Sequence, residues 1–332
     1  MTHRTVLALA AACAVLAAAC TGASVAPSGS AQPSGSAGAD TCTTTPAPQS
    51  GAIEAWSAAA QDPAIFPQII NPAGTLACGT NRFLFSFLDT ANDPIAAPDR
   101  TVTVALYDLG AAPETPVATA EATFIWAIEG SVGIYQATVD LPTAGLYGAE
   151  FRTNAPASDP ETIRVQFDVQ PASSVIGVGD AAPASRTITL ADVGNDIAKL
   201  STDDQPVTAF YETSVADAVA AKKPFLLVFA TPKFCATAQC GPTLDRLKPI
   251  AARHPGLTVI NVEPYELESV DGQLQPVLTG DPGRLTPVAA VNEWRLAAEP
   301  WVFVVDGRGV VTASFMLIFS DADLEAAIKA VE

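Results

Sequence analysis

The sequence predicts a mixed fold, in which an antiparallel β-sandwich is followed by an α/β domain. Between residues 79 and 170, short runs rich in β-branched and aromatic residues are separated by Pro, Gly, Asp and Asn, which is typical of antiparallel strands. From Val207 onward, buried strand patterns alternate with helical ones in the order βαβαββα. The predicted boundaries are signal peptide 1–20, flexible tether 21–41, sandwich with an N-terminal extension 42–170, linker 171–206 and α/β domain 207–332.

The first residues are typical of an exported protein. The basic MTHR precedes the apolar Thr5–Leu16, and LAAAC ends at Cys20, which resembles the lipobox of bacterial lipoproteins. This resemblance implies a lipid on Cys20 and a location on the extracytoplasmic face of the cell membrane, in the cell envelope. Two alternatives stay open, namely secretion after cleavage at an A-x-A site and an uncleaved anchor. The tether that follows would have a root-mean-square reach of roughly 25 Å.

The charge balance excludes one class of partner. Lysine and arginine total 17 against 35 acidic residues, so the net charge is -18. A chain this acidic has no electrostatic footprint for nucleic acid, and an anionic bilayer would repel it. Membrane attachment must therefore be covalent or apolar.

The sandwich is predicted from six strand-like runs. One stretch, LPTAGLYGAEF from Leu141 to Phe151, resembles the tyrosine-corner strand of immunoglobulin-like domains, with Tyr147 in the corner. No residue of this domain suggests catalysis. The six runs are Arg82–Asp89, Thr101–Leu109, Val117–Trp126, Ile134–Leu141, Gly145–Arg152 and Thr162–Gln170.

Cysteine spacing agrees with export. Of six cysteines, Cys13 leaves with the signal peptide and Cys20 would carry lipid, so four remain for two disulfide bonds. A Cys42–Cys78 bond would close a loop worth roughly 3.8 kcal/mol in the chain-entropy treatment. With His254 as the single histidine outside the signal peptide, we expect no metal site and no cofactor. The scattered acidic residues after residue 262 predict a solvated loop rather than a calcium site.

The α/β domain is predicted element by element. Asp306 to Gly309 predicts a hairpin, and Ser320 caps the last helix. The expected helices are Ser214–Lys222, Thr243–Arg253, Val288–Trp294 and Asp321–Val331, and the expected strands are Phe225–Ala230, Leu257–Val262, Trp301–Val305 and Val310–Phe315.

Cys235 and Cys240 lie between the first of these strands and the helix that follows. Residues five apart on a continuous helix lie ~8.6 Å apart and cannot form a disulfide, so the two cysteines need a loop between them. We expect Gly241 to cap the helix and Pro242 to occupy its first position. Both sulfurs would then lie near a helix N-terminus, where a thiolate is favoured. The alternative is a structural disulfide.

The position of Cys235 after a strand and of Pro300 before another resembles the thioredoxin superfamily. CGP at Cys240, Pro249 within a helix and VGDAAP at Val178–Pro183 add to the resemblance, which extends to TlpA-like and peroxiredoxin members. It implies a thioredoxin-like domain, a cis Glu299–Pro300 bond beside the cysteines and a substrate-binding role for both residues. The spacing CATAQC replaces CxxC, and either cysteine can be placed in the attacking position.

The favoured interpretation is a membrane-tethered thiol-disulfide oxidoreductase with a redox-active centre. Cys235 is the expected nucleophile and Cys240 the resolving cysteine, and the expected partners are extracytoplasmic protein thiols or disulfides. One alternative is a non-catalytic envelope adaptor in which the Cys235–Cys240 bond is structural. Another is a peroxiredoxin-like peroxidase with Thr231 and Arg284 or Arg295 around the peroxide. A copper chaperone would need a histidine after His254, and the sequence has none there.

Overall fold

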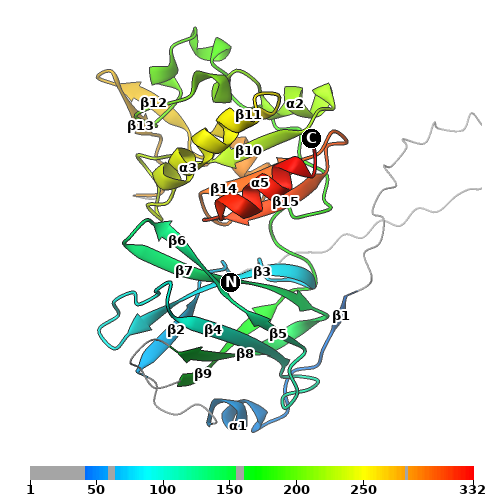
Figure 1. The fold of residues 1–332 in the computed structure, drawn as a ribbon. Coiled ribbons are helices and arrows are strands. Elements are labelled where there is room, and N and C mark those ends of the chain that lie inside the picture. Colours follow the sequence, from blue (N-terminus) through cyan, green and yellow to red (C-terminus); the bar gives the residue numbers. More distant parts are fainter. Residues whose placement is uncertain (1–41, 59–63, 155–160, 281–282) are drawn as a thin grey trace, which may run out of the picture. The chain divides into compact units, whose positions relative to one another are not determined.

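The computed structural model describes residues 42–58, 64–154, 161–280 and 283–332 (Figure 1). The expected signal peptide, tether and lipidated Cys20 lie outside the described residues. Within the described part the chain is predominantly β, and no helix there is both long and apolar enough to cross a membrane.

The predicted sandwich is confirmed as two sheets. In the first, every neighbouring pair is antiparallel and the spatial order is β2-β3-β7-β6 (Figure 1). Alternation along β3 places Phe83, Phe85 and Phe87 in the core between the sheets, because successive side chains of a strand point to opposite faces. The strands are β2 (Ile65–Ile69), β3 (Gly79–Asp89), β7 (Val132–Leu141) and β6 (Thr123–Ile128).

The second sheet has the order β1-β8-β4-β5, with β9 also paired to β8. The run expected as one strand at Val117–Trp126 is two, because the chain leaves this sheet after Glu121 and joins the first sheet at Thr123. Helix α1 (Ala52–Ala58) sets Trp56 on the outer face of β4, with its ring 4.5 Å from that of Tyr107. The strands are β1 (Thr43–Thr44), β8 (Thr143–Asn154), β4 (Thr101–Asp108), β5 (Ala118–Glu121) and β9 (Glu161–Val169).

Two sequence predictions in the sandwich are confirmed. Tyr147 is fully buried, and its hydroxyl donates to the carbonyl oxygen of Thr143, four residues upstream, at 3.0 Å, as expected of a tyrosine corner. Cys42 and Cys78 form a disulfide with their Cα atoms 6.1 Å apart. This bond joins the residue before β1 to the residue before β3.

Residues after 224 form a second sheet system of order β11-β10-β14-β15, in which only the β10 and β11 pair is parallel. The strands are β10 (Phe225–Phe229), β11 (Thr258–Val262), β14 (Trp301–Val305) and β15 (Val311–Met316). Helices α3 (Cys240–Arg253) and α5 (Asp321–Lys329) pack on one face through Leu244, Leu247 and Leu324. Helices α2 (Val215–Ala221) and α4 (Ala289–Glu293) pack on the other.

The helices and strands expected from Phe225 onward are present, with two differences. Helix α3 begins at Cys240 rather than after Gly241, and the residue that caps it, Gln239, makes no side-chain capping bond. A hairpin of β12 (Leu267–Val270) and β13 (Gln273–Pro276) lies where the sequence predicts a loop. Three 3-10 turns precede α2, at η1 (Ala191–Val193), η2 (Ile197–Lys199) and η3 (Thr208–Tyr211).

One buried cluster includes residues from both sheet systems. The face of β3 that points away from the sandwich core contributes Leu84, and β6 and β7 contribute Ile125 and Ile134. These side chains share the cluster with Trp294 and Phe303. The outer face of the first sheet is therefore covered rather than solvated.

Candidate functional site

The disulfide between Cys235 and Cys240 lies at the junction of β10 and α3. Strand β10 is buried along its whole length, and the chain leaves it through the buried Thr231. Cys235 precedes the helix and Cys240 is its first residue, so the Cα atoms come within 6.0 Å of each other. The expectation that these cysteines need a loop between them is confirmed.

The two sulfur-bearing residues differ in exposure and in contacts. Cys240 is fully buried, whereas Cys235 is only partly buried. The backbone N–H of Cys240 donates to Sγ of Cys235 at 3.2 Å, and the hydroxyl oxygen of Thr237 lies 3.3 Å from the same sulfur. The backbone N–H at the start of the helix thus points at the sulfur of the more exposed cysteine, which favours a negative charge there.

Ala238 gives the loop its shape. Its φ is 59°, a left-handed conformation that costs free energy for a residue with a Cβ atom. The backbone N–H of Ala238 donates to the carbonyl oxygen of Cys235 at 3.4 Å, which closes a tight turn between the cysteines. The sequence contains no glycine or asparagine here that would have predicted this conformation.

Glu299 and Pro300 lie beside the cysteine loop, joined by a cis peptide bond as predicted. The hydroxyl of Thr237 donates to the backbone oxygen of Glu299 at 2.8 Å. The backbone N–H of Ala236, next to Cys235, donates to Oε1 of Glu299 at 3.2 Å. Both backbone and side chain of Glu299 therefore hold the loop that carries the disulfide.

Glu299 also lines a pocket of about 140 Å³. Its walls are mostly apolar and include Val291, Leu296 and Ala298, and its polar groups include Tyr265 and Glu299. Burial, together with the charge and hydrogen bond of Glu299, raises the pKa of Tyr265 to about 12. The tyrosine hydroxyl thus stays protonated and donates to the carboxylate at ordinary pH.

Glu263 is one of the acidic residues that the sequence assigns to a solvated loop, and for this residue the prediction is wrong. It follows β11 directly and is buried, whereas Glu266, Glu268 and Asp271 are exposed, as predicted for them. The N–H and hydroxyl of Thr202 donate to its Oε1 at 2.6 and 2.8 Å. Burial raises its pKa to about 7, despite these bonds and one from Thr231. Its position immediately after the buried run TVINV was the available signal.

The residues proposed for a peroxide site have other contacts. Thr231 is buried and its hydroxyl lies 3.3 Å from that of Thr202, while Arg295 pairs with Asp180 at 3.9 Å. Arg284 contacts Thr279 through its backbone oxygen. No described contact joins these groups to Cys235.

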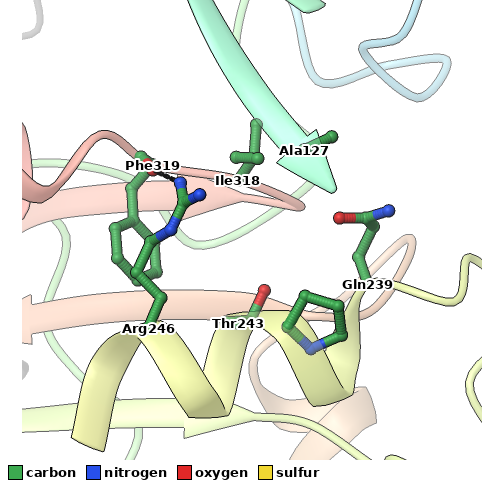
Figure 2. Close-up of a pocket in the computed structure, with 7 residues that line it drawn as sticks. Ala127, Gln239, Thr243, Arg246, Ile318 and Phe319 are labelled. Atoms are coloured by element: carbon green, nitrogen blue, oxygen red, sulfur yellow. Dashed lines mark hydrogen bonds between the residues drawn. The ribbon is translucent and has the colours of Figure 1, made fainter. Parts of the chain in front are cut away.

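A second hollow, shown in Figure 2, is too small to hold a ligand. Its volume is about 10 Å³, roughly that needed for one water molecule. Arg246 of α3 closes it by donating to the backbone oxygens of Phe319 and Trp126 at 2.8 and 3.0 Å. The arginine is thus engaged in holding the chain segments together. No group of three or more possible metal ligands occurs among the described residues.

Comparison with known proteins gives little further information. No family model and no curated protein matches the chain. A DUF4426 family protein from Pseudomonas aeruginosa PAO1 is similar over 34% of this chain and 98% of its own, with 12% identity and a TM-score of 0.24. A conjugative transposon lipoprotein from Bacteroides eggerthii DSM 20697 is similar over 32% and 98%, with 7% identity and a TM-score of 0.19. MtrC from Shewanella baltica OS185 is similar over 48% and 32%, with 12% identity and a TM-score of 0.22.

These findings correct the family expected from the sequence. No thioredoxin-like match is found, and more of the described residues lie in strands than in helices. The assignment to the thioredoxin superfamily is therefore wrong, and an α/β thioredoxin-like domain is not shown. The resemblance depended on a few short segments around Cys235, Pro249 and Pro300. Turns, helix prolines and strand-to-helix junctions require such residues in many folds.

Proposed function

We propose that this chain is a membrane-tethered, extracytoplasmic thiol-disulfide oxidoreductase in which the Cys235–Cys240 bond exchanges with cysteines of other proteins. The observation that supports this most is the asymmetry of the pair. The accessible Cys235 sulfur receives the N–H of Cys240 and faces the hydroxyl of Thr237, whereas Cys240 is fully buried. A purely structural bond would not need a backbone donor directed at one sulfur.

The exchange begins with the oxidised pair present in the structure. A thiolate of a dithiol substrate attacks Sγ of Cys235, which breaks the bond to Cys240 and forms a mixed disulfide. Cys240 leaves as a thiolate at the first residue of α3, where the helix dipole stabilises it until it takes up a proton. The second substrate thiolate then attacks its own cysteine in the mixed disulfide and releases Cys235 as a thiolate. The substrate loses two electrons and the pair gains them.

Single cysteine variants test this proposal. Cys235→Ser should lose all oxidation of a dithiol peptide, because the accessible sulfur is gone. Cys240→Ser, prepared with a free Cys235 thiol and given a disulfide-bonded peptide, should accumulate a mixed disulfide, because no neighbouring thiol can resolve it. Mass spectrometry under non-reducing conditions identifies the adduct.

The double variant Cys42→Ala/Cys78→Ala is the matched control, since it also removes one disulfide but leaves the proposed site intact. It should retain turnover at a temperature where it is folded. If native protein and both single variants show the same negligible exchange, the Cys235–Cys240 bond is structural. The chain would then fit the envelope adaptor instead, with a reduction potential below about -300 mV for this bond.

A further inference from the structure

The pocket beside Glu299 contains a carboxylate without a positive partner. Glu299 is 8% exposed, and no ion pair among the described residues includes it. The groups that contact it, the N–H of Ala236 and the hydroxyl of Tyr265, are neutral donors. Buried carboxylates are normally paired with a cation, so this pocket is incomplete in the free protein.

The shape of the pocket limits what can complete it. Its volume of about 140 Å³ lies well below the roughly 300–1,000 Å³ of sites for drug-sized ligands. Val291, Leu296 and Ala298 offer apolar walls, which suit an aliphatic chain, while the charge is concentrated at Glu299. A single side chain with an apolar stem and a cationic end matches both features.

The position of the pocket relates it to the disulfide. Glu299 lines the pocket, and its Oε1 accepts the N–H of Ala236, the residue after Cys235, so the same residue contacts both the pocket and the cysteine loop. A substrate chain whose cysteine reaches Cys235 can therefore place a neighbouring side chain in the pocket. The net charge of -18 also attracts positively charged segments of a partner.

We infer that the pocket formed by Tyr265, Val291, Leu296 and Glu299 selects substrate proteins that carry a lysine next to the reacting cysteine. The lysine stem packs on the apolar walls and its ammonium group pairs with the Glu299 carboxylate. This inference rests on the proposed exchange at Cys235, because it concerns the substrate of that reaction.

Competition between matched dithiol peptides tests the inference. The peptides differ only beside the first cysteine, where one carries lysine and the other norleucine, which has a similar apolar stem and no charge. The full-length protein should oxidise the lysine peptide with a kcat/KM about tenfold higher, as expected for a hydrogen-bonded charge pair. Glu299→Gln should reduce this ratio to about one.

Two further variants keep the test valid if Glu299→Gln folds poorly. Ala297→Trp, at an exposed residue on the rim of the pocket, should also abolish the preference by blocking entry. Glu293→Gln changes an exposed carboxylate of α4 that does not line the pocket and should preserve the tenfold ratio.

The outcomes separate this inference from the proposed function. If native protein oxidises both peptides equally, or if the preference survives in Glu299→Gln and Ala297→Trp, lysine selection is wrong and the exchange reaction stands. If native protein oxidises neither peptide and does not exchange with dithiothreitol, the proposed function fails and the inference fails with it.

Discussion

Glu263 is a carboxylic acid held away from water. Thr202 satisfies its Oε1, but its Oε2 is buried and has no hydrogen-bond partner. Ionising the group therefore loses hydration that the surroundings do not replace, and the nearby Asp203 adds like-charge repulsion. The protonated acid can instead act as a donor.

This environment makes stability depend on pH. The pKa of Glu263 rises from 4.5 in the unfolded chain to about 7 in the folded one, so the folded state holds its proton more tightly. Its contribution to stability is fully present below about pH 4.5 and is lost as pH rises through about 7. Glu263→Gln keeps an uncharged group, so its free energy of unfolding relative to native protein should rise by roughly 3 kcal/mol between pH 4 and pH 8.

Urea denaturation at several pH values measures this difference. Glu268→Gln is the control, because Glu268 is an exposed carboxylate of β12 whose removal should leave a difference independent of pH. A constant difference for Glu263→Gln across the same range would show that Glu263 has the same pKa in the folded and unfolded chains and would contradict the prediction.

Among the elements, the sandwich depends on a short N-terminal strand. Strand β1 has only two residues and pairs with β8 from Thr43 to Thr143 and from Thr44 to Ala144. So short a strand adds little stability by its own hydrogen bonds. The Cys42–Cys78 bond holds it in place, since Cys42 is the residue immediately before β1.

Removing this bond should destabilise the sandwich measurably. The Cys42–Cys78 bond joins residues 36 positions apart, and in the chain-entropy treatment a loop of this length stabilises the fold by about 4 kcal/mol. Cys42→Ala/Cys78→Ala should therefore lower the free energy of unfolding by up to about 4 kcal/mol in urea or thermal denaturation.

The double variant Cys235→Ser/Cys240→Ser provides the comparison, because it removes a bond with a separation of only 5 residues. Its expected loss is about 2 kcal/mol, less than that for the longer loop. A larger loss for the Cys235 and Cys240 variant would contradict the entropic account and assign that bond a mainly structural role.

Element boundaries show what local pattern can predict. Strands β10, β14 and β15 begin and end within about a residue of their predicted limits, because buried runs flanked by Pro, Gly or Asp carry a strong signal. The division of Val117–Trp126 between two sheets depends on partner strands far along the sequence. The alternation of buried and exposed side chains is the same in both sheets, so it does not show where the chain passes from one sheet to the other.

At the scale of the whole molecule, we propose that the chain is attached to the membrane through Cys20. The sequence LAAAC and the polar segment that follows support this proposal. A covalent lipid would overcome the repulsion between a protein of net charge -18 and an anionic bilayer. Attachment would also keep Cys235 close to other envelope proteins.

Mass spectrometry of the mature protein from the membrane fraction should find an N-terminal Cys20 carrying lipid. Cys20→Ser should release the protein from membranes, because the acceptor of the lipid is lost. Cys13→Ser changes the other cysteine of the same segment and should leave the attachment intact. An unmodified Cys20, or a mature protein that begins elsewhere, would contradict the proposal.

The sequence by itself determined the features that depend on neighbouring residues. The strand runs of the sandwich, the helices and strands after Phe225, the Cys42–Cys78 pairing and the loop between Cys235 and Cys240 all follow from periodicity, turn residues and spacing. These features can be predicted locally because the backbone polar groups of each segment must form hydrogen bonds and its apolar side chains must be buried on one face.

The tertiary structure alone decided which groups meet across the chain. Glu299 comes to Ala236 and Tyr265, Thr202 comes to Glu263, and Leu84 joins a buried cluster on the face of β3 opposite the sandwich core. Each contact joins residues more than thirty positions apart, so no local pattern encodes it. The family assignment was wrong for a related reason. Short motifs reflect local backbone geometry, whereas the way the sheets assemble depends on the burial of apolar residues over the whole chain.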